Sequence, residues 1–360
     1  MQQTIESAKT LLVDGPASVQ LVSGKAEVFA KQLNLDAKVL VPEGKRLPFF
    51  TLEKAVFDIS LGANASFQEV AGNTVSQSWD EPVKAALETL QRPVIVLVLG
   101  KIDSGKSSFC TYIVNKLVNA KGKVAVIDGD LGQSDIGPSG TVGYALTQKP
   151  VTQLRNLKLQ NAFFVGVTSP LLGIVKTVEG LAQLKCEVLQ HQVDFIVINT
   201  DGWVSGDIAL RYKTAMVKEL KPDVVVGVTV QDELDDLIDN LNVSVLKIYA
   251  SPFLGARTAE KRKRLREMTY ARYLEAAKVQ CYPLSQVTVE PRGGLPQKQD
   301  PEKGLLVGLY SGTKLLGIGV LREINQMRKV LKIQTPVVRK TTKIVLGKIW
   351  LDKKGREIVD

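Results

Sequence analysis

The stretch Gly100-Lys-Ile-Asp-Ser-Gly-Lys106-Ser107 constrains the fold of this chain more than any other feature. It matches the G-x-x-x-x-G-K-S/T pattern, follows the apolar run 94–99 and opens a helix-patterned segment, which is the context that this pattern requires. In such a loop backbone N–H groups surround phosphates, the lysine reaches the β and γ oxygens, and the serine hydroxyl can bind Mg²⁺. The sequence therefore predicts a nucleoside triphosphate site. Its expected nucleotide-binding residues are Gly100, Asp103, Ser104, Gly105, Lys106, Ser107 and Ser108.

From residue 93 onward, apolar strand patterns alternate with helical patterns. The alternation is typical of a mostly parallel sheet covered by helices on both faces, with ligand-binding loops at the carboxyl ends of its strands. We therefore expect an α/β fold of the P-loop NTPase type. The expected strands are 94–99, 124–127, 162–167, 195–199, 224–228 and 243–249.

The segments on both sides of this region have β-type patterns. Residues 11–79 show short apolar alternations between glycine and proline turns, and 80–90 favours a helical connection. The proline-rich segment 282–304 marks the end of the nucleotide domain. Strands are expected after it at 305–310, 315–321, 330–333 and 343–350. The expected domains are a β-rich N-terminal domain at 1–88, a P-loop domain at 89–278 and a β-rich C-terminal domain at 279–360.

Charge indicates the kind of partner. The 360 residues include 47 Lys and Arg against 37 Asp and Glu, a formal net charge of +10, and the basic residues cluster at 257–272 and 322–356. Clustered cations gain affinity by releasing counterions from phosphates, so nucleic acid is the leading candidate. We find no apolar run of membrane-spanning length and no secretory pattern at the start, so we expect no membrane partner and a cytoplasmic location.

The single histidine and the three cysteines limit the chemistry. With one imidazole, proton transfer at neutral pH is expected to use a carboxylate, a lysine or water, which disfavours Ser-His-Asp and Cys-His mechanisms. His191 is expected at a helix end or on the surface. Cys110, Cys186 and Cys281 are odd in number and widely spaced, which fits neither a disulfide framework nor a zinc site.

Two carboxylates follow the second expected strand, in Asp128-Gly-Asp130-Leu-Gly-Gln133. With Asp128 at the strand end near Mg²⁺, Asp130 projects further into the cleft, where an incoming hydroxyl needs a base. Ser107 and Asp128 are the expected metal ligands. Thr168-Ser169-Pro170 and Thr200-Asp-Gly-Trp203 follow later strands, at the same edge of such a sheet.

Two of these features have two interpretations each. Trp203 either offers a stacking face to a nucleic-acid base or closes the core over the sheet. The basic segment 257–272 is either a solvated helix face or a closing lid, whose arginines would stabilise the charge that develops in phosphoryl transfer.

Together the motifs resemble those of the polynucleotide 5′-hydroxyl kinase family, which includes the RNA kinases of pre-mRNA cleavage and rRNA processing, and most of all its compact archaeal members. The resemblance extends over the whole chain, because these proteins also flank the kinase domain with β-rich domains. It implies ATP and Mg²⁺ as cofactors and transfer of the γ-phosphoryl to a 5′-hydroxyl end of RNA, with DNA left open and RNA-processing proteins as further partners. The motifs that carry it are 100–107, 128–133, Thr168-Ser-Pro170, Thr200-Asp-Gly-Trp203 and Arg257-x-x-x-x-Arg262.

The resemblance also implies a role for each motif residue. Lys106 and Ser107 would hold ATP and Mg²⁺, and Asp130 would accept the proton of the 5′-hydroxyl. The lid would supply Arg257 and Arg262. The N-terminal domain would border the adenine, with Lys45 or Arg46 as candidates. The residues implied to bind the acceptor end are Gln133, Thr168, Ser169 and Trp203.

Other functions stay open at this point. Lys101 stands where the deviant phosphate loop of partitioning and metal-pump ATPases has its signature lysine, although that family expects Gly-Gly where Ile102-Asp103 stands. An ATP-binding scaffold or switch in an RNA-processing complex would use the same loop without transferring phosphate. A GTPase is disfavoured, because no Asn-Lys-x-Asp motif follows the fifth expected strand.

Overall fold

A computed structural model gives the fold of residues 1–290 and 303–358. Pro291, Pro296 and Pro301 of the proline-rich segment lie outside these described residues. The chain forms two compact units. The first comprises Met1–Val126, Leu146–Lys158 and His191–Lys261, and the second comprises Ile127–Ala145, Leu159–Gln190 and Arg262–Asp360.

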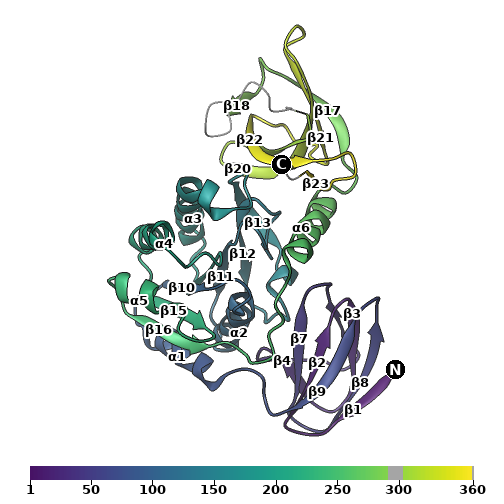
Figure 1. Cartoon of the computed structure of the whole chain (residues 1–360), viewed down its shortest axis with the longest axis vertical. Coiled ribbons are helices and arrows are strands. Elements are labelled where there is room, and N and C mark those ends of the chain that lie inside the picture. Colours follow the sequence, from purple (N-terminus) through teal and green to yellow (C-terminus); the bar gives the residue numbers. More distant parts are fainter. Residues whose placement is uncertain (291–302, 359–360) are drawn as a thin grey trace. The chain divides into compact units, whose positions relative to one another are not determined.

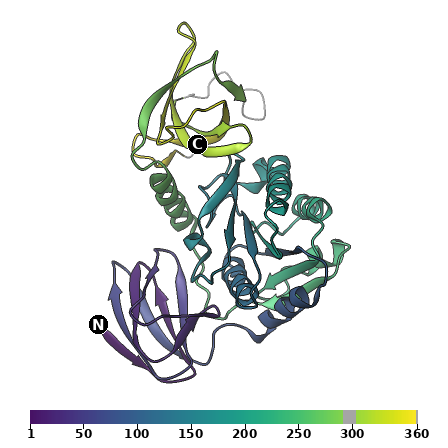
Figure 2. The ribbon, with the colours of Figure 1, turned by 180° about the vertical axis from the view of Figure 1, so that it is seen from behind.

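The N-terminal part of the first unit consists of two antiparallel sheets, drawn in purple and blue in Figures 1 and 2. Their strand orders are β1-β8-β3-β6 and β5-β4-β7-β2-β9. Alternate residues of β8, namely Ala55, Phe57 and Ile59, are buried, and the ring of Phe57 lies 5.9 Å from that of Phe49 in the other sheet. The two inner faces therefore share one core, as in a sandwich. The strands are β1 (Gln2–Ile5), β2 (Lys9–Asp14), β3 (Ala17–Ser23), β4 (Ala26–Val28), β5 (Lys31–Gln32), β6 (Lys38–Val41), β7 (Arg46–Thr51), β8 (Ala55–Leu61) and β9 (Ser66–Ala71).

The α/β part of the first unit contains four parallel strands in the order β14-β10-β15-β16. Every residue of the first three is buried, as expected for strands covered on both faces. The four strands expected here are confirmed, with β16 beginning two residues late. The elements are η1 (Gln77–Trp79), α1 (Asp80–Glu88), β10 (Val94–Gly100), α2 (Lys106–Asn119), η2 (Leu154–Asn156), β14 (Phe195–Thr200), α4 (Asp207–Leu220), β15 (Val224–Thr229), α5 (Asp235–Asn240) and β16 (Val245–Tyr249).

The second unit differs from the simple alternation that the sequence predicts. β11 (Val124–Gly129) starts in the first unit and ends in the second, and β12 (Thr141–Thr147) then pairs antiparallel with β13 (Leu159–Phe164). We did not predict β12, and the strand expected at 162–167 begins and ends earlier. The 3-10 helix η3 (Pro170–Leu172) and helix α3 (Ile174–Leu189) follow.

The C-terminal strands of the second unit have the order β17-β21-β20-β19-β22-β18, and β23 pairs with β22. The four strands expected after residue 304 are confirmed. Tyr270 of helix α6 (Ala259–Tyr273) is fully buried in a core cluster with residues of β19, β20 and β22. The strands are β17 (Lys278–Pro283), β18 (Thr288–Glu290), β19 (Leu305–Ser311), β20 (Lys314–Asn325), β21 (Val330–Thr335), β22 (Lys343–Leu351) and β23 (Glu357–Ile358).

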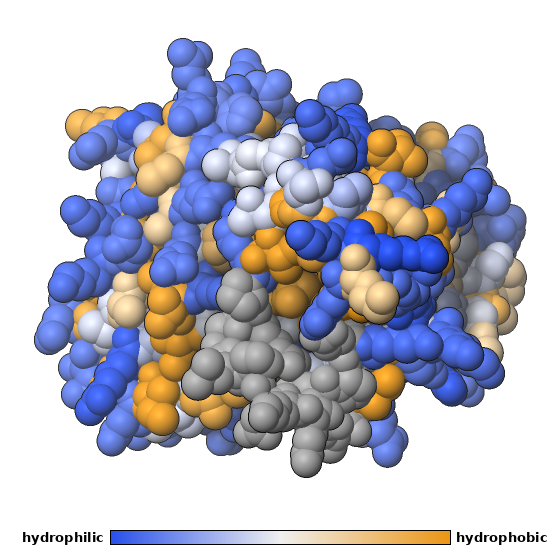
Figure 3. Space-filling view, turned by 90° about the horizontal axis from the view of Figure 1, so that it is seen from above, coloured by the Kyte–Doolittle hydropathy of each residue, from blue (hydrophilic) through white to orange (hydrophobic). Residues whose placement is uncertain are grey.

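The exposed side chains are mainly polar, as the composition leads us to expect. Figure 3 shows a face on which hydrophilic side chains predominate and apolar ones form small groups. Within residues 1–290 and 303–358, no helix has the length and apolarity needed to cross a membrane. His191 is exposed just after α3, as expected. Cys110 is buried, Cys186 and Cys281 are exposed, and all three are free thiols.

Candidate functional site

The loop after β10 is shaped for close approach of its own backbone. An ideal Cβ on Gly100 would lie 2.6 Å from the carbonyl oxygen of Val228 and 2.7 Å from Ser104 Oγ. Gly105 has a φ of 91° and precedes α2, which no side chain caps. Because the first N–H groups of a helix have no intrahelical partner, this end of α2 is suited to bind an anion.

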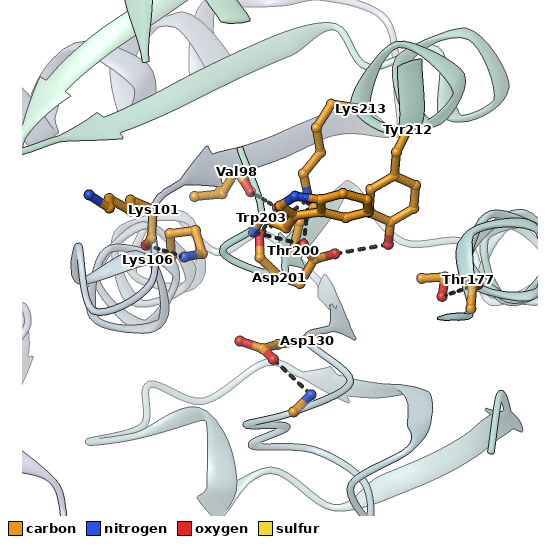
Figure 4. A network of polar contacts seen from close by, with 12 residues as sticks. Val98, Lys101, Lys106, Asp130, Thr177, Thr200, Asp201, Trp203, Tyr212 and Lys213 are labelled. Atoms are coloured by element: carbon orange, nitrogen blue, oxygen red, sulfur yellow. Dashed lines mark hydrogen bonds and ion pairs between the residues drawn. The ribbon is translucent and has the colours of Figure 1, made fainter. Parts of the chain in front are cut away.

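Lys106 and Ser104 complete this phosphate loop. The Lys106 side chain is buried, and its Nζ donates to the carbonyl oxygen of Lys101 at 2.7 Å (Figure 4). The hydroxyl of Ser104 is buried and has no hydrogen-bond partner in the part of the chain that the structure describes. Leaving such a group unsatisfied costs about 1–3 kcal/mol, so a phosphate oxygen in the loop would relieve that cost.

Asp103 connects the phosphate loop to the start of the basic segment. Arg257 Nε donates to Asp103 Oδ1 at 2.9 Å, and the Arg257 backbone N–H donates to Oδ2 at 3.0 Å. The arginine side chain is 23% exposed and the carboxylate 14%. Arg257 is therefore held beside the loop, as a lid arginine would be.

The Thr200-Asp201-Gly202-Trp203 segment packs against the same loop. The Thr200 hydroxyl donates to the carbonyl oxygen of Val98 on β10 at 2.8 Å. An ideal Cβ on Gly202 would lie 2.5 Å from the backbone nitrogen of Ile102, so only glycine fits. Trp203 is half-buried.

Sequence reasoning missed two residues that hold this segment. The Asp201 carboxylate accepts from Lys213 Nζ at 3.0 Å, from the Tyr212 hydroxyl at 2.8 Å and from the Trp203 N–H at 3.0 Å (Figure 4). Tyr212 and Lys213 lie on α4, eleven and twelve positions after Asp201. The carboxylate of Asp201 within the motif indicates that a partner is needed. The sequence does not show which side chains of a helix bond to it.

In the second unit, Asp128 and Asp130 organise their own loop. Asp128 is fully buried, and its Oδ2 accepts from the Asp135 N–H at 2.6 Å and the Ser134 hydroxyl at 3.1 Å. Asp130 is half-buried, and its Oδ1 accepts from the N–H groups of Gly132 and Gln133 at 3.0 and 2.9 Å. One oxygen of Asp130 thus fixes the turn that presents the carboxylate.

The second unit also gathers the other expected acceptor residues. Gln133 Nε2 donates to the carbonyl oxygen of Arg262 at 3.1 Å. An ideal Cβ on Gly132 would lie 3.4 Å from the carbonyl oxygen of Thr168, and Ser169 follows directly before η3. Asp130, Gln133, Thr168 and Arg262 therefore belong to one local cluster.

Helix α6, which carries Arg262, is fixed to the C-terminal strands. Arg266 donates to both oxygens of Glu357 at 2.6 Å, and Glu267 Oε1 accepts from the Glu357 N–H at 3.0 Å. Burial raises the pKa of Tyr270 on the same helix well above its usual value, so this phenol stays neutral. The exposed face of α6 remains basic.

A largely apolar hollow lies beside the first turn of α2. Arg46, one of the two residues expected near the adenine, lines it and donates to the carbonyl oxygen of Phe253 at 2.8 Å. Burial acts to raise the pKa of Asp14, but the hydrogen-bonded Arg46 guanidinium outweighs it and lowers that pKa. Lys45, the other candidate, is not part of the lining. The lining residues are Leu12, Phe29, Arg46, Pro48, Thr74, Trp79, Ser108, Ser251, Phe253, Leu254 and Gly255.

The sheet and the phosphate loop define a P-loop nucleotide-binding protein. Residues 100–276 match the family model described as the P-loop of the mRNA cleavage and polyadenylation factor CLP1. Residues 100–276 belong to this family.

Individual relatives agree with this assignment. The polyribonucleotide 5′-hydroxyl-kinase of Methanocaldococcus jannaschii is 24% identical over 337 residues, covering 76% of this chain and 91% of the relative. The polyribonucleotide 5′-hydroxyl-kinase Clp1 of Xenopus tropicalis is 28% identical, covering 77% and 68%. A solved structure of a Clp1p–Pcf11p complex matches with a TM-score of 0.77 over 97% of both chains at 13% identity, a likeness of fold.

Proposed function

We propose that this protein is an ATP-dependent polynucleotide 5′-hydroxyl kinase that acts on RNA. The names of its relatives support this activity. The observation that carries the proposal is the packing of Gly202 on Ile102, which sets a half-buried tryptophan next to an intact phosphate loop. A partitioning-type ATPase offers no reason for an aromatic platform there, whereas a kinase for nucleic-acid ends needs one.

The first unit would bind the nucleotide. The triphosphate would lie on the N-terminus of α2, with Lys106 exchanging the carbonyl of Lys101 for phosphate oxygens. Ser104 would gain its missing partner there. The base would enter the apolar hollow beside Ser108, between aromatic side chains such as Trp79 and Phe253.

Asp130 and its neighbours would activate the acceptor. Asp130 would take the proton as the 5′-oxygen forms a bond to the γ-phosphorus, while the bond from that phosphorus to the bridging oxygen breaks and ADP leaves. Gln133, Thr168 and Ser169 would fix the acceptor end, and Arg257 and Arg262 would stabilise the charge that develops.

Mg²⁺ would neutralise charge on the phosphates. No cluster of three or more His, Cys, Asp or Glu side chains able to hold a metal occurs within residues 1–290 and 303–358, so the ion would take most of its ligands from ATP and water. Ser107 and Asp128 remain our candidates from the protein. Because loop N–H and hydroxyl groups already occupy the Asp128 oxygens, we expect that residue to act through a bound water.

Three finer points belong to the proposal. DNA ends stay open as acceptors. RNA-processing proteins are proposed as partners, since the similar solved structure is of Clp1p in complex with Pcf11p. The cytoplasm is the proposed place of reaction, as expected from the sequence.

A labelled-phosphate assay tests the proposal. Purified protein, γ-labelled ATP and Mg²⁺ are incubated with an oligoribonucleotide that carries either a 5′-hydroxyl or a 5′-phosphate. Label is expected on the hydroxyl-ended strand alone. Release of labelled phosphate with neither strand labelled would instead favour an ATPase or switch.

Replacing Trp203 with alanine is expected to raise the KM for the acceptor and to leave the Kd for ATP, measured without acceptor, unchanged. Loss of a stacked base costs about 1–3 kcal/mol, or about 5- to 150-fold. The Trp203→Phe variant keeps an aromatic face and should retain part of the affinity. An unaltered acceptor KM in the alanine variant would assign Trp203 to the core.

A further inference from the structure

Lys213 is a fully buried lysine that the proposed chemistry does not use. Its side chain has 0% exposure and its partner Asp201 3%, with 3.0 Å between Nζ and Oδ1. Nζ also donates to the Asp201 carbonyl oxygen at 3.2 Å and lies 4.8 Å from the centre of the Tyr212 ring. Desolvating two charges costs several kcal/mol, so a buried pair gives little net stability. A role in fixing the local conformation explains the buried pair of Lys213 and Asp201 better than a gain in stability.

The pair fixes the turn that carries Trp203. Oδ1 of Asp201, which accepts from Lys213, also accepts from the Trp203 N–H at 3.0 Å, and Oδ2 accepts from the Tyr212 hydroxyl. The Trp203 and Tyr212 rings lie 5.9 Å apart with 36° between their planes. One carboxylate therefore bonds both to the backbone of Trp203 and to Tyr212, whose ring lies beside that of the tryptophan (Figure 4).

The other side of the same turn contacts the phosphate loop. Thr200 bonds to Val98, two residues before Gly100, and Gly202 lies against the backbone of Ile102. The turn is thus enclosed between the loop that would hold the triphosphate and the helix that carries Lys213. A shift of either neighbour must be passed on to Trp203, because interiors are close-packed.

We propose that Lys213 is a positioning residue, which through Asp201 holds the Thr200–Trp203 turn against the phosphate loop and so couples acceptor binding at Trp203 to nucleotide binding. The inference rests on the proposed function, because it takes Trp203 to contact the acceptor. Coupling between two sites is reciprocal. A bound nucleotide therefore lowers the Kd of the acceptor by the same factor as a bound acceptor lowers the Kd of the nucleotide.

The experiment measures the Kd of a fluorescent 5′-hydroxyl oligoribonucleotide with and without a non-hydrolysable ATP analogue. In the wild type the analogue is expected to lower the Kd of the oligoribonucleotide by about 5-fold or more. Lys213→Met replaces the charged side chain with an uncharged one that is one atom shorter. This variant is expected to raise the Kd of the oligoribonucleotide about tenfold and to leave the Kd of the analogue within about twofold of the wild-type value. The coupling factor, which is the ratio of the oligoribonucleotide Kd values without and with the analogue, should fall close to 1.

Two further variants make the result specific. Tyr212→Phe removes only the hydroxyl donated to Asp201, so it should fold even if Lys213→Met does not, and it should reduce the coupling factor as well. Lys218→Met, an exposed lysine on the same helix, should match the wild type.

Three outcomes would overturn the inference. They are a wild type that shows no coupling, a folded Lys213→Met or Tyr212→Phe with full coupling, and an equal loss of nucleotide and acceptor binding in Tyr212→Phe. The labelled-phosphate assay separates the two proposals. Coupling without phosphoryl transfer would contradict the kinase assignment alone. Transfer without coupling would contradict only the role of Lys213.

Discussion

Changing Lys106 to alanine is expected to reduce phosphoryl transfer by at least about 10³-fold in kcat/KM. The buried ammonium already lies within the phosphate loop, bonded to the carbonyl of Lys101 at 2.7 Å, and needs only to exchange that oxygen for those of the phosphates. Initial rates with labelled ATP and a hydroxyl-ended oligoribonucleotide measure the effect. The melting temperature checks that the variant is folded.

The matched control is Lys101→Ala in the same loop. The Lys101 side chain is exposed, and Figure 4 shows its ammonium directed away from that of Lys106. Its backbone carbonyl is retained in the variant, so transfer should stay within a few-fold of the wild type. A loss as large as that of Lys106→Ala would favour the deviant phosphate loop, in which the lysine at position 101 is the signature residue.

The Asp130→Asn variant is expected to lower kcat by about 10²- to 10⁴-fold with little change in the KM for ATP. Asparagine keeps an Oδ1 that can accept from the N–H groups of Gly132 and Gln133, so the turn should survive. What it loses is a carboxylate able to take the proton of the 5′-hydroxyl. Steady-state kinetics with each substrate varied in turn distinguishes these effects.

Asp135→Asn serves as the comparison for this prediction. Asp135 lies in the same loop, and it is its backbone N–H, not its side chain, that bonds to Asp128. Its variant should therefore transfer phosphate at close to the normal rate. If Asp130→Asn weakened ATP binding as much as it slowed turnover, Asp130 would not be the base.

Sequence patterns predicted the fold where each strand was a compact apolar run. The residues of β10, β14 and β15 are all buried, and their boundaries follow from composition. β12 was missed because Gly143 interrupts a short apolar run that has a threonine at each end, although its first five residues are buried. Its antiparallel pairing with β13 depends on contacts that no local pattern encodes.

The motifs predicted the candidate site only in part, because spacing shows which residues share a loop but not what holds the loop. The Asp103 to Arg257 ion pair spans 154 positions, and the partners of Asp201 come from a helix. A lysine on an amphipathic helix would ordinarily be placed in solvent. Only the three-dimensional structure shows that Lys213 is buried against a carboxylate.

The Arg266 to Glu357 ion pair has a consequence for the order of assembly during synthesis. Its two members are 91 positions apart, and the acidic member follows almost all of the described chain. A nascent polypeptide can fold its earlier domains while the ribosome is still extending it. Helix α6 cannot acquire this carboxylate until residue 357 has been synthesised, so the arginine-bearing helix reaches its final environment only after 91 further residues have been added.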